Sequence, residues 1–335
     1  MNIRIAATCL LAIIAIPVVA QADESASRCA ECTVGATTQF SAGSAGSPNL
    51  ITFGYDGRLW FSDNALGVIK AMTTGGTVTQ YALPAGASPN DLTPGADHRV
   101  WFADVTRNKI SAITTSGVLS EYAIPTQQSI PLGVALGRDG NVWFTEDLGN
   151  KVGKITPAGV ITEYPLPSPN SFPAFIVGDL SGNQWVAEQG RNAILKVTSA
   201  GVMTETALAG VADGPGQLAL GIDGNVWFTT VAGVAKITSA GVVTAYPVPG
   251  STGLVDITTG PDGALWATDP GSDTVFRITT SGAVTSFAVG EGFGLNGITL
   301  LLALDFGCDA APLSLWATKS GSNSIAKIRV AGCDH

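Results

Sequence analysis

The chain has 335 residues, of which 45% are hydrophobic and 13% are charged, with 41 glycines and a formal net charge of −9. This composition is typical of a turn-rich β protein that has enough apolar residues for a large core. The scarcity of Lys and Arg argues against nucleic acid or an anionic membrane surface as a partner.

The first element in chain order is a targeting signal at residues 1–22. The short positive start MNIR precedes the apolar run IAATCLLAIIAIPVVA, and Ala20-Gln21-Ala22 forms a small-residue cleavage site. The apolar run is too short to span a membrane comfortably, and no later segment is a candidate. We therefore expect an exported protein, periplasmic or extracellular, with no transmembrane segment and one domain over residues 23–335.

The rest of the chain is built on one repeat, and each copy contains one tryptophan. The tryptophans recur about every 42 residues, the spacing of propeller and solenoid repeats, at Trp60, Trp101, Trp143, Trp185, Trp227, Trp266 and Trp316. Within the unit 131–167 the pattern predicts four strands, at 132–137, 141–146, 151–156 and 160–166. We expect the turn at Asp139-Gly140 to have positive φ at both residues. Four strands in seven copies predict an all-β, seven-bladed β-propeller of antiparallel blades, with the tryptophans packed between blades.

The seventh unit has no fourth strand of its own. The segment VGATTQFSA at 34–42 aligns with AGVITEYPL at 158–166, which places Phe40 where Tyr164 stands. We expect this N-terminal strand to complete blade 7 and to close the ring.

Four cysteines outside the signal gather near the closure. Cys29 and Cys32 precede the donated strand, Cys333 follows the last strand, and Cys308 lies in an insertion of blade 7 near 303–313. An exported protein with an even number of cysteines is typically disulfide-bonded, and we expect the pairs Cys32–Cys333 and Cys29–Cys308. The alternative, that Cys29-Ala-Glu-Cys32 is a redox or metal pair, lacks the second motif that a zinc site needs.

One position at the end of the second strand is acidic in most repeats. Around the ring it holds Asp63, Asp104, Glu146, Glu188, Thr230, Asp269 and Lys319. Carboxylates at one face could hold Mg²⁺ or Ca²⁺, with Glu146, Glu188 and Asp269 as candidate ligands. A position that recurs in nearly every blade is better explained as part of the blade, as a carboxylate that accepts backbone N–H groups.

The first position of the inner strands differs from blade to blade. It holds Asn49, Asn90, Leu132, Ala174, Gly216, Val255 and Asn296. The three asparagines belong to neighbouring blades and can both donate and accept hydrogen bonds. One hypothesis is that they bind a small polar ligand with help from Asp63 and Asp104. The equally weighted alternative is that they satisfy turn backbone.

The segment NVWFTEDLGNKVGKITPAGVITEYPLP at 141–167 resembles the repeat signature of the virginiamycin B lyase, or streptogramin lyase, family, and the resemblance covers residues 34–332. It implies a seven-bladed propeller and a magnesium-dependent lyase that opens a cyclic depsipeptide by elimination at an ester C–O bond. It also implies histidines where this chain has Val255 and Asn296, and a glutamate where it has Gly294. In the metal-ligand region the chain has Lys319 and Ser320. Its two histidines, His98 and His335, stand elsewhere.

These departures remove the base that an elimination needs near neutral pH. We therefore expect a monomeric binding propeller without the classical lyase activity, whose partner is a small polar ligand or another exported protein. The alternative is an enzyme, either a divergent metal-dependent lyase or a lactone hydrolase, that uses Mg²⁺ or Ca²⁺ at the channel mouth.

Overall fold

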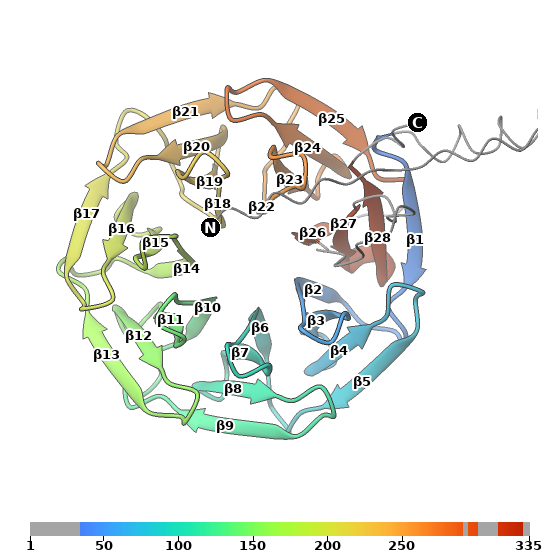
Figure 1. The fold of residues 1–335 in the computed structure, drawn as a ribbon, viewed down its shortest axis with the longest axis horizontal. Helices are drawn as coiled ribbons and strands as arrows, with labels where there is room; N and C mark the ends of the chain where they lie inside the picture. The colour runs from blue at the N-terminus through green and yellow to red at the C-terminus, as the bar shows by residue number, and fades with distance from the viewer. Residues whose placement is uncertain (1–33, 291–293, 301–313, 331–335) are drawn as a thin grey trace, which may run out of the picture.

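A computed structural model describes residues 34–290, 294–300 and 314–330 and shows seven four-stranded sheets around a central axis (Figure 1). Within each sheet the strands are antiparallel, and in six of the seven sheets they follow one another along the chain from the innermost strand to the outermost. The predicted seven-bladed β-propeller is therefore confirmed. Among the described residues, no helix is long and apolar enough to cross a membrane.

The blades are numbered here in chain order, and each is given from its inner strand outward. Blade 1 is β2 (Pro48–Phe53), β3 (Leu59–Asp63), β4 (Val68–Met72) and β5 (Val78–Ala82), and blade 2 is β6 (Pro89–Pro94), β7 (Val100–Asp104), β8 (Lys109–Ile113) and β9 (Leu119–Ala123). Blade 3 is β10 (Pro131–Leu136), β11 (Val142–Glu146), β12 (Lys151–Ile155) and β13 (Ile161–Pro165), and blade 4 is β14 (Pro173–Gly178), β15 (Gln184–Glu188), β16 (Ala193–Val197) and β17 (Met203–Ala207). Blade 5 is β18 (Leu218–Leu220), β19 (Val226–Thr230), β20 (Gly233–Ile237) and β21 (Val243–Pro247), and blade 6 is β22 (Asp256–Thr259), β23 (Leu265–Asp269), β24 (Thr274–Ile278) and β25 (Val284–Ala288). Blade 7 is β26 (Leu295–Leu300), β27 (Ser314–Lys319), β28 (Ser324–Arg329) and β1 (Thr37–Ser41), with the short 3₁₀ helix η1 (Ser320–Ser322) between β27 and β28.

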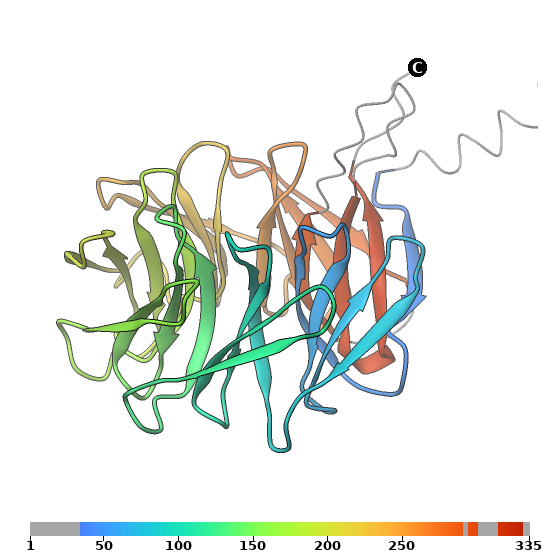
Figure 2. The same ribbon diagram turned by 60° about the horizontal axis from the view of Figure 1, so that its bottom comes forward.

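Blade 7 combines the two ends of the propeller. Strand β1 pairs antiparallel with β28, from Thr37 opposite Ile328 to Ser41 opposite Ser324 (Figures 1 and 2). The ring of Phe40 lies 5.3 Å from that of Trp316, as the ring of Tyr164 lies 5.6 Å from that of Trp143. The N-terminal strand therefore occupies the register that the sequence alignment predicts, and ring closure is confirmed.

The Asp-Gly turn differs from its prediction. Gly140 has a φ of 76°, whereas Asp139 is not among the residues with positive φ. The N–H of Gly140 donates to the carbonyl of Gly137 at 3.0 Å, and the N–H of Gly137 donates to the carbonyl of Asn141 at 2.8 Å. This is the three-residue hairpin that combines a type I turn with a left-handed glycine. The expectation of positive φ at both residues is wrong, because the loop contains three residues, 138–140, and in this type of loop only the last of them takes a positive φ. The Asp139 carboxylate accepts the N–H of Asn141 and the indole N–H of Trp143.

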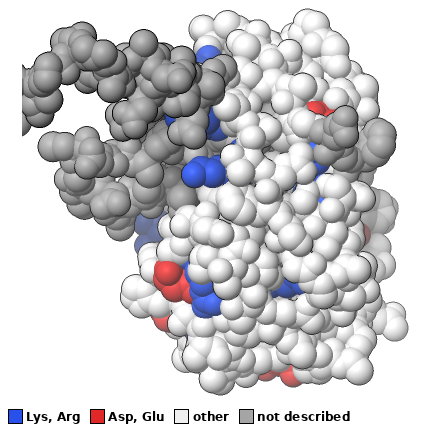
Figure 3. Space-filling model, turned by 90° about the vertical axis from the view of Figure 1, so that its right-hand side faces the viewer, with Lys and Arg blue, Asp and Glu red and all other residues white. Residues whose placement is uncertain are grey.

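The tryptophans form the core between neighbouring blades. Trp101 of blade 2 packs with Val134, Val142 and Phe144 of blade 3, and every tryptophan is at most 3% exposed. The outer surface carries little charge, and the side of the ring in Figure 3 shows basic and acidic groups scattered among uncharged residues. The ring is therefore held together by apolar side chains that are buried between the blades.

Several sequence expectations fall outside the described residues. These are the signal at 1–22, the insertion near 303–313, the terminal His335 and the cysteines Cys29, Cys32, Cys308 and Cys333. The two disulfide pairs stay a prediction.

Candidate ligand site at the channel mouth

The inner strands of all seven blades begin at one end of the central channel, and a cavity of about 190 Å³ opens there. The structure brings the three predicted asparagines together at this cavity. Asn49 donates from Nδ2 to Oδ1 of Asn90 at 3.2 Å, and Asn90 donates from Nδ2 to the carbonyl of Leu132 at 3.3 Å. The amide of Asn296 has no hydrogen bond to any described residue, so it is the most available of the three.

The other side chains at the mouth are mixed in character. The cavity is also lined by Leu50, Leu132, Phe175, Gln217, Val255 and Asp256. Gln217 and Asp256 were missed by sequence reasoning, which examined only the first residue of each inner strand. Both occupy the second position, directly after Gly216 and Val255. A comparison of the second residue of each inner strand from blade to blade, instead of the first, identifies both.

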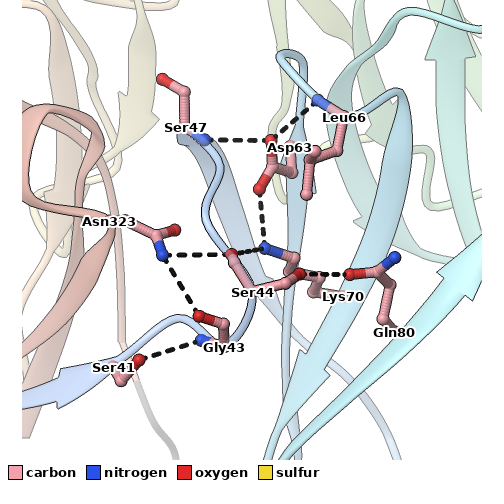
Figure 4. A network of polar contacts seen from close by, with 9 residues as sticks. All are labelled: Ser41, Gly43, Ser44, Ser47, Asp63, Leu66, Lys70, Gln80 and Asn323. Atoms are coloured by element: carbon pink, nitrogen blue, oxygen red, sulfur yellow. Dashed lines mark hydrogen bonds and ion pairs between the residues drawn. The ribbon is translucent and has the colours of Figure 1, made fainter.

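Asp63 does not reach the mouth. It is fully buried between two loops, where it accepts N–H groups of Ser47 at 3.0 Å and Leu66 at 3.2 Å (Figure 4). Its second oxygen lies 2.7 Å from Nζ of Lys70, which is equally buried. Its bonds hold together the loop that leads into β2, the loop between β3 and β4, and Lys70 of β4. Asp63 is not among the residues that line the cavity.

Asp104 and Asp269 are held in the same way. Asp104 accepts the N–H of Ser88 at 3.0 Å and lies 3.4 Å from Nη1 of Arg107. Burial alone would raise the pKa of Asp269, but hydrogen bonds from Thr252 and Ser251 outweigh burial and hold the pKa below its usual range. These are the contacts of carboxylates that support loops.

Glu146 and Glu188 are different, because their carboxylates are fully buried and form no hydrogen bond of ordinary geometry with a described residue. The nearby hydroxyls of Ser129 and Ser171 offset the effect of burial on their pKa only in part. Burial raises the pKa of each to about 7, with a further contribution from the nearby Glu163 and Glu205 respectively. In the described ranges no group of three or more His, Cys, Asp or Glu side chains is placed to hold a metal ion. Glu146, Glu188 and Asp269 therefore do not form the shared metal site that one hypothesis placed there.

These two glutamates predict a pH dependence of stability. Below the ordinary pKa of 4.5 both folded and unfolded chains hold the proton, whereas toward pH 7 only the folded chain keeps it. The free energy of unfolding should therefore fall as pH rises from about 4.5 to about 7, by on the order of 1–2 kcal/mol for each glutamate.

Urea unfolding across this pH window checks the prediction, with the double variant E146Q/E188Q as comparison. The free energy of unfolding of the variant should change clearly less with pH than that of the parent, and the variant should be more stable than the parent at about pH 8. Profiles of equal slope for the two proteins would contradict this account of the buried carboxyls.

The region where the resemblance implies magnesium contains a cation of the chain itself. Nζ of Lys319 is buried and lies 2.9 Å from Oδ2 of Asp273, and it donates to the carbonyl of Val289 at 3.0 Å. A fixed ammonium repels a divalent ion. The residues present therefore do not fit the magnesium ion of the family.

The described histidine, His98, lies at the far end of the ring. It takes the glycine position of the turn between β6 and β7 with a φ of 63°, and its ring packs against Tyr55 at 4.8 Å. Since β7 runs from this turn to the mouth, His98 cannot act on a ligand held by the asparagines.

The Virginiamycin B lyase family model matches residues 20–235 and 217–334. A catalytically inactive histidine-to-alanine variant of virginiamycin B lyase from Staphylococcus aureus, solved with quinupristin, is similar with 29% identity over 88% of this chain and 99% of its own, and a TM-score of 0.79. A streptogramin B lyase structure is similar with 28% identity over 88% and 97%, with the same TM-score. The hydrazine synthase of Kuenenia stuttgartiensis, at 12% identity over 87% and 97% with a TM-score of 0.71, shares the fold alone. No curated protein matches the chain.

Proposed function

The chain belongs to the virginiamycin B lyase family, and from this premise we propose that it is an exported binding propeller that takes a small polar ligand at its channel mouth without cleaving it. The observation that carries the proposal is the convergence of Asn49, Asn90 and Asn296 on one cavity. Their amides recognise hydroxyl, amide and carbonyl groups, and the apolar Leu132 and Phe175 on the facing arc cover an uncharged portion of the ligand.

None of the described residues that line this mouth is a histidine, which supports binding over the elimination that the family resemblance implies. The titratable group in the described lining is Asp256, whose pKa burial raises to about 7 and whose carboxyl accepts two backbone N–H groups, so it is the candidate base for the alternative, a divergent lyase. Val255 and Asn296 stand at the positions where the family resemblance implies histidine, and neither can remove a proton near neutral pH. The structural relative named above is described as inactive when one histidine is replaced by alanine, which supports the same conclusion.

The first test is chemical. Incubation of the protein with quinupristin for hours, with and without Mg²⁺, should leave the antibiotic cyclic, as followed by liquid chromatography against a control without protein. A linearised product above that control would overturn the non-catalytic assignment and would favour the divergent lyase.

The second test concerns the mouth. A thermal-shift screen of neutral sugars and small amides should yield ligands whose affinity falls at least tenfold in the variant N49A/N90A/N296A, since each lost hydrogen bond costs about 0.5–1.5 kcal/mol. The matched control is N225A, in the exposed turn at the opposite end, where Asn225 bonds to Asp223. A ligand whose affinity survives the triple change, or falls equally in N225A, places the site elsewhere.

A further inference from the structure

Below the mouth the channel continues into a second cavity of about 300 Å³. Its walls are apolar apart from the backbone, Thr93 and three side chains, Asp91, Gln217 and Asp256. Asp91 belongs to β6 and Asp256 to β22, and these strands face each other from nearly opposite sides of the ring (Figure 1). Two carboxyls and one amide thus share an otherwise apolar space with no Lys or Arg in its lining.

The two carboxyls make equivalent contacts with the backbone. Asp91 accepts the N–H of Leu92 at 2.8 Å on one oxygen and that of Val134 in the next blade at 3.0 Å on the other. Asp256 accepts the N–H groups of Ile257 at 2.8 Å and Ile298 at 2.7 Å in the same pattern. Each carboxylate oxygen therefore keeps a lone pair that a further partner can use.

The fold does not require an acid at this position. In blades 3 and 7 the equivalent residues are Gly133 and Gly297, and a Cβ at Gly133 would lie 2.7 Å from the carbonyl oxygen of Ala174. Those blades bring the backbones of neighbouring inner strands into direct contact. Thr145 bridges from Gly133 to the carbonyl of Ala174 and Thr318 bridges from Gly297 to the carbonyl of Asn49. The carboxyls of blades 2 and 6 are thus an addition to the repeat, made in spite of the cost of burying a charge.

No cation of the described chain offsets that cost. Neither Asp91 nor Asp256 forms an ion pair with a described residue, and burial raises the pKa of both to about 7, while the charge on Asp91 further raises the pKa of Asp256. The two carboxyls therefore affect each other electrostatically across the cavity. A divalent cation would neutralise both at once.

Gln217 adds a third polar side chain to the same space. It is only 8% exposed and it lines both the mouth and the lower cavity. Its side-chain amide has no hydrogen bond to any described residue. The amide of Gln217 therefore faces the channel space and is available to a ligand or ion there.

We propose that the lower channel holds a hydrated divalent cation, Mg²⁺ or Ca²⁺, between Asp91 and Asp256, with the amide oxygen of Gln217 as a third contact. Carboxylate and amide oxygens suit these hard ions, which keep part of their water shell in wide sites. This site differs from the acidic positions at the ends of the second strands and does not depend on the mouth binding any ligand.

The test is a titration of chelator-treated, full-length protein with MgCl₂ and with CaCl₂ at about pH 8, one unit above the raised pKa values. Calorimetry should show one saturable site for at least one of the two ions. Its affinity should fall at least a hundredfold in D91N/D256N and about tenfold in Q217L, which removes no bond to a described residue. Q217L keeps the test decisive if the double variant does not fold.

The matched control is E146Q/E188Q, which removes two other buried carboxyls of raised pKa that lie away from the channel. It should bind the ion as the parent does. The proposal is overturned if neither ion binds to the folded parent at about 10 mM, an order above the weakest calcium modules. It is equally overturned if Q217L binds like the parent, or if E146Q/E188Q abolishes binding.

Discussion

Replacing Asp63 by asparagine should lower the free energy of unfolding by about 3–5 kcal/mol, because it leaves a buried ammonium without its counter-charge. Nζ of Lys70 lies 2.7 Å from Asp63 with both side chains fully buried. Lys70 also donates to the carbonyl of Ser44, to which Nδ2 of Asn323 donates as well (Figure 4). The pair thus stabilises the segment that leads from β1 of blade 7 into blade 1, at the closure of the ring.

The equivalent position in the next blade supplies the control. Asp104 is just as buried, but its partner Arg107 is 20% exposed and 3.4 Å away, so D104N should cost no more than about 1 kcal/mol. In the double variant D63N/K70M the loss should be largely recovered, because an apolar side chain replaces the unpaired charge. Urea unfolding of the three variants measures these changes in the free energy of unfolding. An equal decrease in D63N and D104N would exclude a special role for the buried pair.

The second large effect is expected at Trp143, whose truncation to alanine should cost about 3–5 kcal/mol. The indole is fully buried between blades 3 and 4, where it packs with Ile176 and Val186. Its ring stacks on Tyr164 at 17°, and Nζ of Lys154 lies 5.0 Å from the ring centroid on a neighbouring strand. Alanine removes all of these contacts and leaves a void that neighbouring side chains fill only in part.

The variant W143F separates packing from the polar contact. Phenylalanine keeps an aromatic ring against Tyr164 but loses the N–H that bonds to Asp139, so the loss should be about 1–2 kcal/mol. Urea unfolding at one pH measures both variants. If the free energy of unfolding falls less in W143A than in W143F, the assignment of this residue to the core between blades is contradicted.

The architecture could be predicted in detail because each blade repeats the same sequence pattern of strands and turns. The four strands expected at 132–137, 141–146, 151–156 and 160–166 are observed at Pro131–Leu136, Val142–Glu146, Lys151–Ile155 and Ile161–Pro165. The meeting of Asn49, Asn90 and Asn296 followed from the same symmetry, since equivalent positions of a ring converge on its axis. Repetition therefore predicts positions well.

Repetition predicts the chemistry of those positions less well. Asp63 and Asp104 accept the N–H of a serine in the preceding loop, at Ser47 and Ser88. In blades 3 and 4 the serine stands one residue further from the start of the inner strand, and the loop contains residues with positive φ. The N–H groups of these serines, Ser129 and Ser171, donate instead to Asn108 and Asn150. Glu146 and Glu188 therefore lack the backbone N–H bond that Asp63 and Asp104 accept, and a sequence in which most of these positions are simply acidic does not reveal it.

The pairing of β1 with β28 has a consequence for the order of events during synthesis. Gly43 and Asn323, which join the two strands at the closure, are 280 residues apart, an interval that takes about 14–56 s at ordinary elongation rates of about 5–20 residues per second. The first strand to leave the ribosome therefore waits for the last one, with its edge unpaired and open to other strands throughout. The ring therefore closes only after β28 has been made, and a chaperone that covers β1 during that interval would raise the yield of folded protein without affecting its final stability.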